Sequence, residues 1–86
     1  MTAATVTEQR IFVPGLRVGI INGQNDNTSS FGFNNVAGAV LTNSDDDEFA
    51  SITAISAGVA TIGLVDDTGS AVTTDRDIYF VAWGSD

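Results

Sequence analysis

Short runs of β-branched residues separated by turn-forming residues dominate this sequence, and no stretch of ten or more residues repeats an apolar residue at helical spacing. Apolar residues three and four positions apart indicate an amphipathic helix, whereas runs of Val, Ile and Thr bounded by Gly, Asn and Asp indicate strands. About six to seven such runs follow one another, which predicts an all-β fold, a small antiparallel β-sandwich of jelly-roll type.

The turn signals place the expected strands. Residues 5–13 form the first run, which Pro14-Gly15 ends. Residues 16–21 form the second run, and we expect its core-facing side to carry Leu16, Val18 and Ile20. Asn22-Gly23 is a favoured pair in two-residue hairpin turns, so a tight turn is predicted there. Later strands are expected at residues 36–42, 50–56 and 59–64, with a turn at Ala57-Gly58 between the last two.

The final run, "IYFVAWG" at residues 78–84, is apolar on both sides. Alternation puts Ile78, Phe80 and Ala82 on one face. The opposite face carries Tyr79, Val81 and Trp83. A strand that is apolar on both faces is typical of the centre of a sandwich or of a surface that meets another subunit.

The 86 residues suffice for one domain, and they include no cysteine that could form a disulfide. A chain of this size buries only roughly 60–65% of the surface that its unfolded form exposes, so its core is small. We therefore expect reinforcement by association, in a homotrimer or another small cyclic oligomer. Residues 1–14 are expected to form an extended N-terminal arm and first strand, and residues 15–86 the β-sandwich domain.

The charge is strongly acidic, with eleven Asp and Glu against three Arg and a net charge of −8. Nucleic-acid binding relies on Lys and Arg that neutralise phosphates, and anionic membranes attract basic segments. The balance therefore argues against both partners. The N-terminus "MTAATVTEQR" has no secretory pattern, which predicts a chain made in a cytoplasm.

The tripeptide Asp67-Thr68-Gly69 resembles the catalytic motif of retroviral-type aspartic proteases, in which two close carboxylates share one proton. Asp66 stands where that family needs an apolar residue, and its charge would disturb the shared proton. The residues after Gly69 are also too few for the flap and closing helix of such a protease. We interpret the tripeptide as a turn, with Asp67 capping it and Gly69 at positive φ.

The sequence lacks the residues that other catalytic systems require. Without His, Cys or Lys there is no Ser-His or Cys-His nucleophile, no Schiff base and no imidazole metal ligand. The run Asp45-Asp46-Asp47-Glu48 and the loop at residues 25–29 carry oxygen ligands that calcium prefers, but neither has the spacing of an EF-hand. Both are interpreted as solvated loops, with calcium binding at the acidic run left open. No catalytic residue, metal site or cofactor is predicted.

The sequence contains more aromatic residues than so small a core obviously needs. Trp and Tyr are enriched where proteins meet, because one end is apolar and the other forms hydrogen bonds. Each aromatic residue also has an ordinary core interpretation. The residues that we predict at an interface are Val6, Arg10, Phe31, Phe33, Tyr79 and Trp83.

Four stretches carry a resemblance to a known class: "PGLRVGI", "VAGAVLT", "ITAISAGVATIGL" and "DIYFVAWG". From Gly15 to Gly84 the chain resembles small virion proteins of tailed bacteriophages, especially those of aquatic hosts. The resemblance implies a β-sandwich, often trimeric, that decorates or cements a capsid or contributes to head or tail fibres. It implies no catalytic residue.

The expected function is therefore that of a capsid decoration protein, located on the virion and in the host cytoplasm during assembly. It would stabilise the head by bridging subunits of the major capsid protein. For the N-terminal arm two interpretations stay open: it adds a strand to a coat or sister subunit, with Arg10 pairing a carboxylate, or it is a frayed terminus. The alternative is a trimeric glycan-binding adhesin, or a fibre or tail component, because the final strand is similar to that of trimeric lectin domains.

Overall fold

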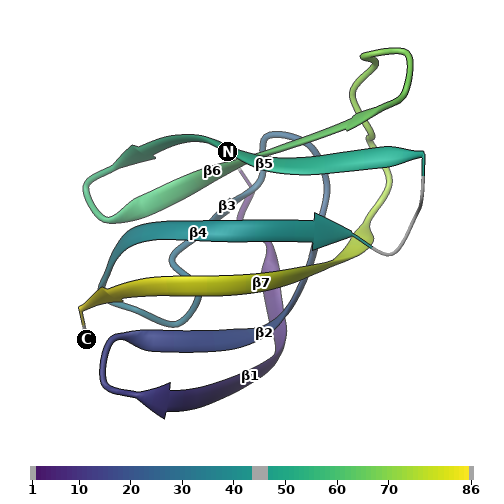
Figure 1. Ribbon diagram of the computed structural model, residues 1–86. Coiled ribbons are helices and arrows are strands. Elements are labelled where there is room, and N and C mark those ends of the chain that lie inside the picture. The colour runs from purple at the N-terminus through teal and green to yellow at the C-terminus, as the bar shows by residue number, and fades with distance from the viewer. Residues whose placement is uncertain (1, 44–46, 86) are drawn as a thin grey trace.

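The computed structural model describes residues 2–43 and 47–85, and in this part of the chain seven strands form two antiparallel sheets (Figure 1). The strands are β1 (Thr5–Val13), β2 (Leu16–Gly23), β3 (Thr28–Ser29), β4 (Asn35–Asn43), β5 (Glu48–Ser56), β6 (Val59–Asp66) and β7 (Arg76–Ser85). The four-stranded sheet has the order β1-β2-β7-β4, and the three-stranded sheet has the order β3-β6-β5. The predicted all-β sandwich is confirmed.

Two hairpins turn where the sequence indicates. Pro14 and Gly15 join β1 to β2, with Gly15 at a φ of 90°. Ala57 and Gly58 join β5 to β6, and both have positive φ, at 52° and 78°. Two successive residues of positive φ are what a tight hairpin between twisted strands requires.

The predicted turn at Asn22-Gly23 is wrong. Both residues continue β2, where they pair with Asp77 and Arg76 of β7. A Cβ atom on Gly23 would lie 2.8 Å from Cβ of Ala4, so glycine is needed here for close packing of the N-terminal segment. The chain turns later, after β2 has ended.

The core lies between the two sheets. Its fully buried large side chains are Phe31, Phe80, Ile21, Ile62, Leu64 and Ile78. The rings of Phe31 and Phe80 pack with centroids 4.8 Å apart, which joins the loop after β3 to the middle of β7. The alternation predicted for the final strand is confirmed, because Ile78, Phe80 and Ala82 are all buried.

The face predicted to be buried in β2 is the wrong one. Ile21 is fully buried, so the core-facing side of β2 is the one that also carries Arg17 and Gly19. Arg17 lies over the ring of Phe33, with Cζ 4.7 Å from the centroid, and its Nη1 donates to the carbonyl oxygen of Gly32 at 2.7 Å. The side of β2 with Leu16, Val18 and Ile20 therefore points away from the core.

An ion pair connects the two sheets at one end. Arg76, the first residue of β7, donates from Nε to Oε1 of Glu48 at 3.2 Å and from Nη2 to Oε2 at 3.4 Å. Glu48 begins β5 in the other sheet. The fork-like geometry of two parallel hydrogen bonds fixes these strand ends relative to each other.

Candidate functional site

The solvent side of the four-stranded sheet, which we call the outer face, is the most unusual surface of the molecule. It brings together the side chains that alternate away from the core on β2, β7 and β4. Its large apolar residues are Leu16, Val18, Ile20, Val40, Tyr79, Val81 and Trp83. The exposed fractions are 63% for Val40, 44% for Trp83, 42% for Tyr79 and 41% for Val81.

The strand register arranges this face in rows that run across the sheet. Val18, Val81 and Val40 are cross-strand partners and form one row. The next row contains Ile20, Tyr79 and Thr42. A hollow of about 340 Å³ lies at these two rows and is lined mainly by apolar side chains.

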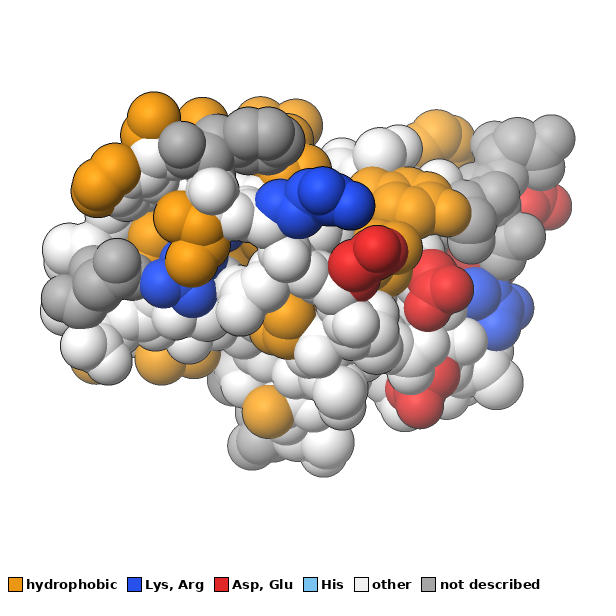
Figure 2. Space-filling model, turned by 90° about the horizontal axis from the view of Figure 1, so that it is seen from below, with side chains coloured by type: hydrophobic (Ala, Val, Ile, Leu, Met, Phe, Trp, Pro, Cys, Tyr) orange, Lys and Arg blue, Asp and Glu red, His pale blue; other side chains and the backbone are white. Residues whose placement is uncertain are grey.

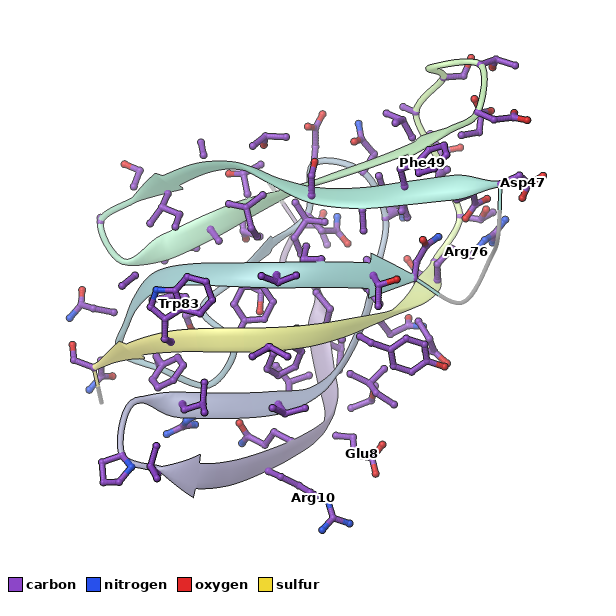
Figure 3. All side chains as sticks on the ribbon, in the orientation of Figure 1. Glu8, Arg10, Asp47, Phe49, Arg76 and Trp83 are labelled. Atoms are coloured by element: carbon purple, nitrogen blue, oxygen red, sulfur yellow. The ribbon has the colours of Figure 1, made fainter. Side chains whose placement is uncertain are left out.

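Trp83 stands beyond the valine row and is held over β4 (Figure 3). Its cross-strand partner there is Gly38, and a Cβ atom on Gly38 would lie 2.5 Å from Cζ2 of the indole. Because Gly38 has no side chain, the indole ring can pack directly against the backbone of β4.

Two residues of opposite charge stand at the β1 side of the hollow. Glu8 and Arg10 pair in register with Ile20 and Val18, and both line the hollow (Figure 3). Within the part of the chain that the structure describes, neither side chain forms an ion pair or a side-chain hydrogen bond. In Figure 2, hydrophobic side chains gather along the upper margin of the molecule, with basic and acidic side chains side by side beneath it.

Five of the six predicted interface residues fall into two groups. Tyr79, Trp83 and Arg10 lie on the outer face. Phe31 and Phe33 do not: they are 0% and 4% exposed, so their assignment to an exposed interface is corrected. The turn that follows β3 sets Phe31 at a φ of 53° and directs both rings into the core.

Val6 is half-buried and packs against the core from β1. The segment expected to form an extended arm is partly built into the domain, because residues 5–13 pair with β2 as β1. Ala4 donates from its backbone N–H to Thr28 at 2.8 Å, which anchors the residues before this strand. Whether the segment also contacts a partner stays a prediction.

β1 is nevertheless an edge strand. It stands at the end of the order β1-β2-β7-β4, and among the residues described no strand pairs with its outer edge. Ile11 and Val13 on this strand are more than half exposed. Backbone N–H and C=O groups at an open edge can accept a strand from another chain.

The segment around Asp67 is a turn, as predicted, but its capping residue is Asp66. Oδ1 of Asp66 accepts hydrogen bonds from the backbone N–H of Thr68 at 2.9 Å and of Ser70 at 3.0 Å. The hydroxyl of Thr68 donates to the same oxygen at 2.6 Å. These hydrogen bonds, that of the Thr68 hydroxyl first, hold the pKa of Asp66 below its usual value. Gly69 has the expected positive φ, at 86°.

In the loop at residues 25–29, two side-chain amide oxygens accept hydrogen bonds from backbone N–H groups. Oδ1 of Asn25 accepts from the N–H of Leu64 at 2.9 Å, and Oδ1 of Asn27 accepts from the N–H of Gln24 at 3.0 Å. Of the acidic run, Asp45 and Asp46 lie outside the described residues, while Glu48 binds Arg76. Residues 2–43 and 47–85 contain no group of three or more acidic side chains placed to hold a metal ion.

No described segment is a helix long and apolar enough to cross a membrane.

Comparison with models of known protein families finds no match, and neither curated proteins nor solved structures match the chain.

The apolar character of 78–84 and the charge of Arg10 were visible in the sequence. The contributions of Val18, Ile20, Val40 and Glu8 to the outer face were missed. The signal for the β2 residues was present, since three apolar residues alternate there, but they were assigned to the opposite side of the sheet.

Proposed function

We propose that this chain is a non-enzymatic structural protein of a virion, a capsid decoration protein that bridges coat subunits and so stabilises the head. The observation that carries the proposal is that one sheet presents two separate exposed surfaces. The outer face presents an apolar surface, and β1 presents an open backbone edge. A bridging protein needs two separate surfaces, because it must hold two neighbours at once.

The residue inventory supports a binding role. The sequence contains no His, Cys or Lys, and the hollow on the outer face is lined largely by aliphatic residues. Glu8 and Arg10 are the charged residues that line it. Polar groups for substrate orientation or proton transfer are therefore few, whereas apolar area for protein association is large.

The β1 edge suits the contact with the coat. When a strand from a partner adds to a sheet edge, the affinity comes from main-chain hydrogen bonds and depends little on side chains. Such binding is therefore possible along Thr5–Val13, where polar and apolar residues are mixed. The register shifts between Val6 and Glu8 and between Ile11 and Val13 limit the length of regular strand that a partner can pair with. This restriction favours a specific partner over open-ended aggregation.

Two measurements test the function. Electron microscopy of purified particles should locate the protein on the capsid surface, and its absence from the particles would refute the assignment. Hydrogen exchange should then compare free and particle-bound protein. Backbone amides of β1 are expected to become protected on the particle, while unchanged exchange in β1 would refute attachment through this edge.

Glycan binding is the second candidate, and the exposed rings of Tyr79 and Trp83 favour it. Both lie on one side of β7, where flat aromatic surfaces can stack on the apolar face of a sugar ring. The valines between them offer no hydrogen-bonding side-chain groups to sugar hydroxyls. A glycan array distinguishes the two functions, because reproducible sugar binding that is lost in Trp83→Ala would favour the adhesin.

A further inference from the structure

We propose that the outer face binds a second copy of this chain about a two-fold axis, with Glu8 of each copy pairing Arg10 of the other. The axis crosses the strands along the cross-strand row of Gln9, Gly19, Phe80 and Leu41. This association is a property of the isolated protein and does not depend on the capsid assignment. It also replaces the trimer expected from the sequence with a pair.

The outer face is an extensive apolar surface for so small a protein. Four strands spaced about 4.8 Å apart, each contributing about six residues at about 3.3 Å per residue, give a face of roughly 400 Å² in projection. Apolar patches of a few hundred Å² are among the largest that soluble monomers expose, and they are often functional. The central strand β7 places Tyr79, Val81 and Trp83 in the middle of this patch.

The distribution of charge favours a second copy over a basic partner. The chain carries a net charge of −8, so two copies repel one another unless their acidic groups stand apart. Asp47, Asp66 and Asp67 lie on the loops and strand ends of the β5–β6 side, away from the outer face. The charged side chains that line the hollow are one acid and one base. Asp77 adds one acidic group at an end of the face. Most of the negative charge of the chain still lies elsewhere, so the face can meet its own copy without a large electrostatic cost.

Glu8 and Arg10 make the face complementary to itself. They stand on either side of Gln9 on β1, have opposite charges and have no ionic partner within the described chain. In a two-fold contact, residue i meets residue j of the partner and residue j meets residue i. An axis through Gln9 therefore places each glutamate opposite the other copy's arginine and forms two ion pairs.

The strand register allows the same two-fold axis to run across all four strands of the sheet. Gln9 pairs with Gly19, Gly19 with Phe80, and Phe80 with Leu41, so these four residues form one row. The hollow is lined symmetrically about this row. A two-fold axis along it sets Tyr79 of one copy opposite Val81 of the other and sets Ile20 opposite Val18. A large side chain thus meets a smaller one on β7 and on β2, and the hollow provides room for the tyrosine ring.

The end rows also complement each other. Trp83 and Asp77 stand three residues on either side of Phe80, and Asp77 lies in register with Asn22 on the same sheet. The same axis brings Trp83 of one copy opposite Asp77 of the other. The indole N–H is a donor that usually finds an acceptor when it becomes buried, and the Asp77 carboxylate supplies acceptor oxygens.

Charge reversal tests the pairing directly. Glu8→Arg should place like charges opposite each other twice in the pair, and Arg10→Glu should do the same with the opposite sign. Like charges juxtaposed at an interface cost several kcal/mol, so each variant alone should raise the dissociation constant at least about tenfold. An equimolar mixture of the two variants should restore association to within about threefold of the native protein, because every contact is then between opposite charges.

The controls separate this contact from loss of the fold. The double variant Glu8→Arg/Arg10→Glu should associate with itself again, and Asp67→Arg, which makes the same charge change on a distant turn, should leave association unchanged. Circular dichroism should be the same for all variants, since Glu8 and Arg10 are exposed. Sedimentation velocity should show native pairs. A native monomer, a native trimer or a mixture that stays dissociated would each overturn the proposal.

Discussion

The indole of Trp83 lies against Gly38 of the neighbouring strand, and a Cβ atom at that position would stand 2.5 Å from Cζ2 and 2.7 Å from Cε2. The ring rests on the backbone of β4 because glycine leaves the space open. Trp83 is the only tryptophan in the chain, so the tryptophan emission comes from this residue alone.

Gly38→Ala should displace the indole from the sheet. The expected result is a shift of the emission maximum to longer wavelength in dilute protein, because the displaced ring becomes more hydrated. Thr42→Ala, four residues further along the same strand, should leave the emission unchanged. An unchanged spectrum in Gly38→Ala would show that the ring does not rest on Gly38.

The turn at Asp66 should make stability depend on pH. The folded state holds the pKa of Asp66 below its usual value, so ionised Asp66 stabilises the fold above the usual Asp pKa. This contribution is lost as the pH falls through the lowered pKa of the folded state. Urea unfolding should therefore show native protein more stable than Asp66→Asn at neutral pH, with the difference shrinking in acid.

NMR titration of the Asp66 carboxyl provides an independent check. Its midpoint should lie below that of an Asp in a short unstructured peptide. An equal or higher midpoint would contradict the hydrogen bonds from Thr68 and Ser70.

The ion pair between Glu48 and Arg76 should couple the two sheets. A double-mutant cycle with Glu48→Gln and Arg76→Met should give a coupling free energy of about 1 kcal/mol, at the upper end for exposed pairs because the contact is bidentate and part-buried. Chemical unfolding of the four proteins measures it. A coupling free energy indistinguishable from zero would mean that the pair does not stabilise the fold.

The two sides of β7 should respond differently to truncation. Phe80→Ala should lower the free energy of unfolding by about 3–5 kcal/mol, because it opens a cavity beside Phe31. Val81→Ala, the next residue and 41% exposed, should cost about 1 kcal/mol or less in dilute protein. Similar losses in both variants would contradict the assignment of the two faces.

The fold class could be predicted from short β-branched runs between turn signals. The residues that share a face of β7 could be predicted because 78–84 is one uninterrupted run, in which successive side chains point to opposite sides of the strand. The faces of β2 were assigned wrongly for a physical reason. Its buried side carries Arg17, whose guanidinium covers Phe33, and Gly19, where a Cβ atom would overlap the carbonyl oxygen of Glu8. In a sequence, a charged residue and a glycine at alternate positions indicate the solvent-exposed side of a strand. In β2, however, Arg17 and Gly19 lie on the side that faces the core.

The outer face could be predicted only in part. Tyr79, Trp83 and Arg10 were predicted at an interface, but the surface that they share depends on the pairing of β7 with both β2 and β4. Register shifts in β1 and β4 decide which residues of these strands share that surface. Such shifts depend on backbone packing between distant segments, so no local pattern reveals them.

The molar mass of the isolated protein shows whether the outer face is an association surface. Sedimentation equilibrium at micromolar concentration should give twice the 8.9 kDa of one chain for the native protein. Val40→Asp, on the outer face, should give a single chain. Phe49→Asp, at an exposed apolar residue of the other sheet, should still give two. A native mass of one chain at every concentration, or two chains in Val40→Asp, would contradict the account.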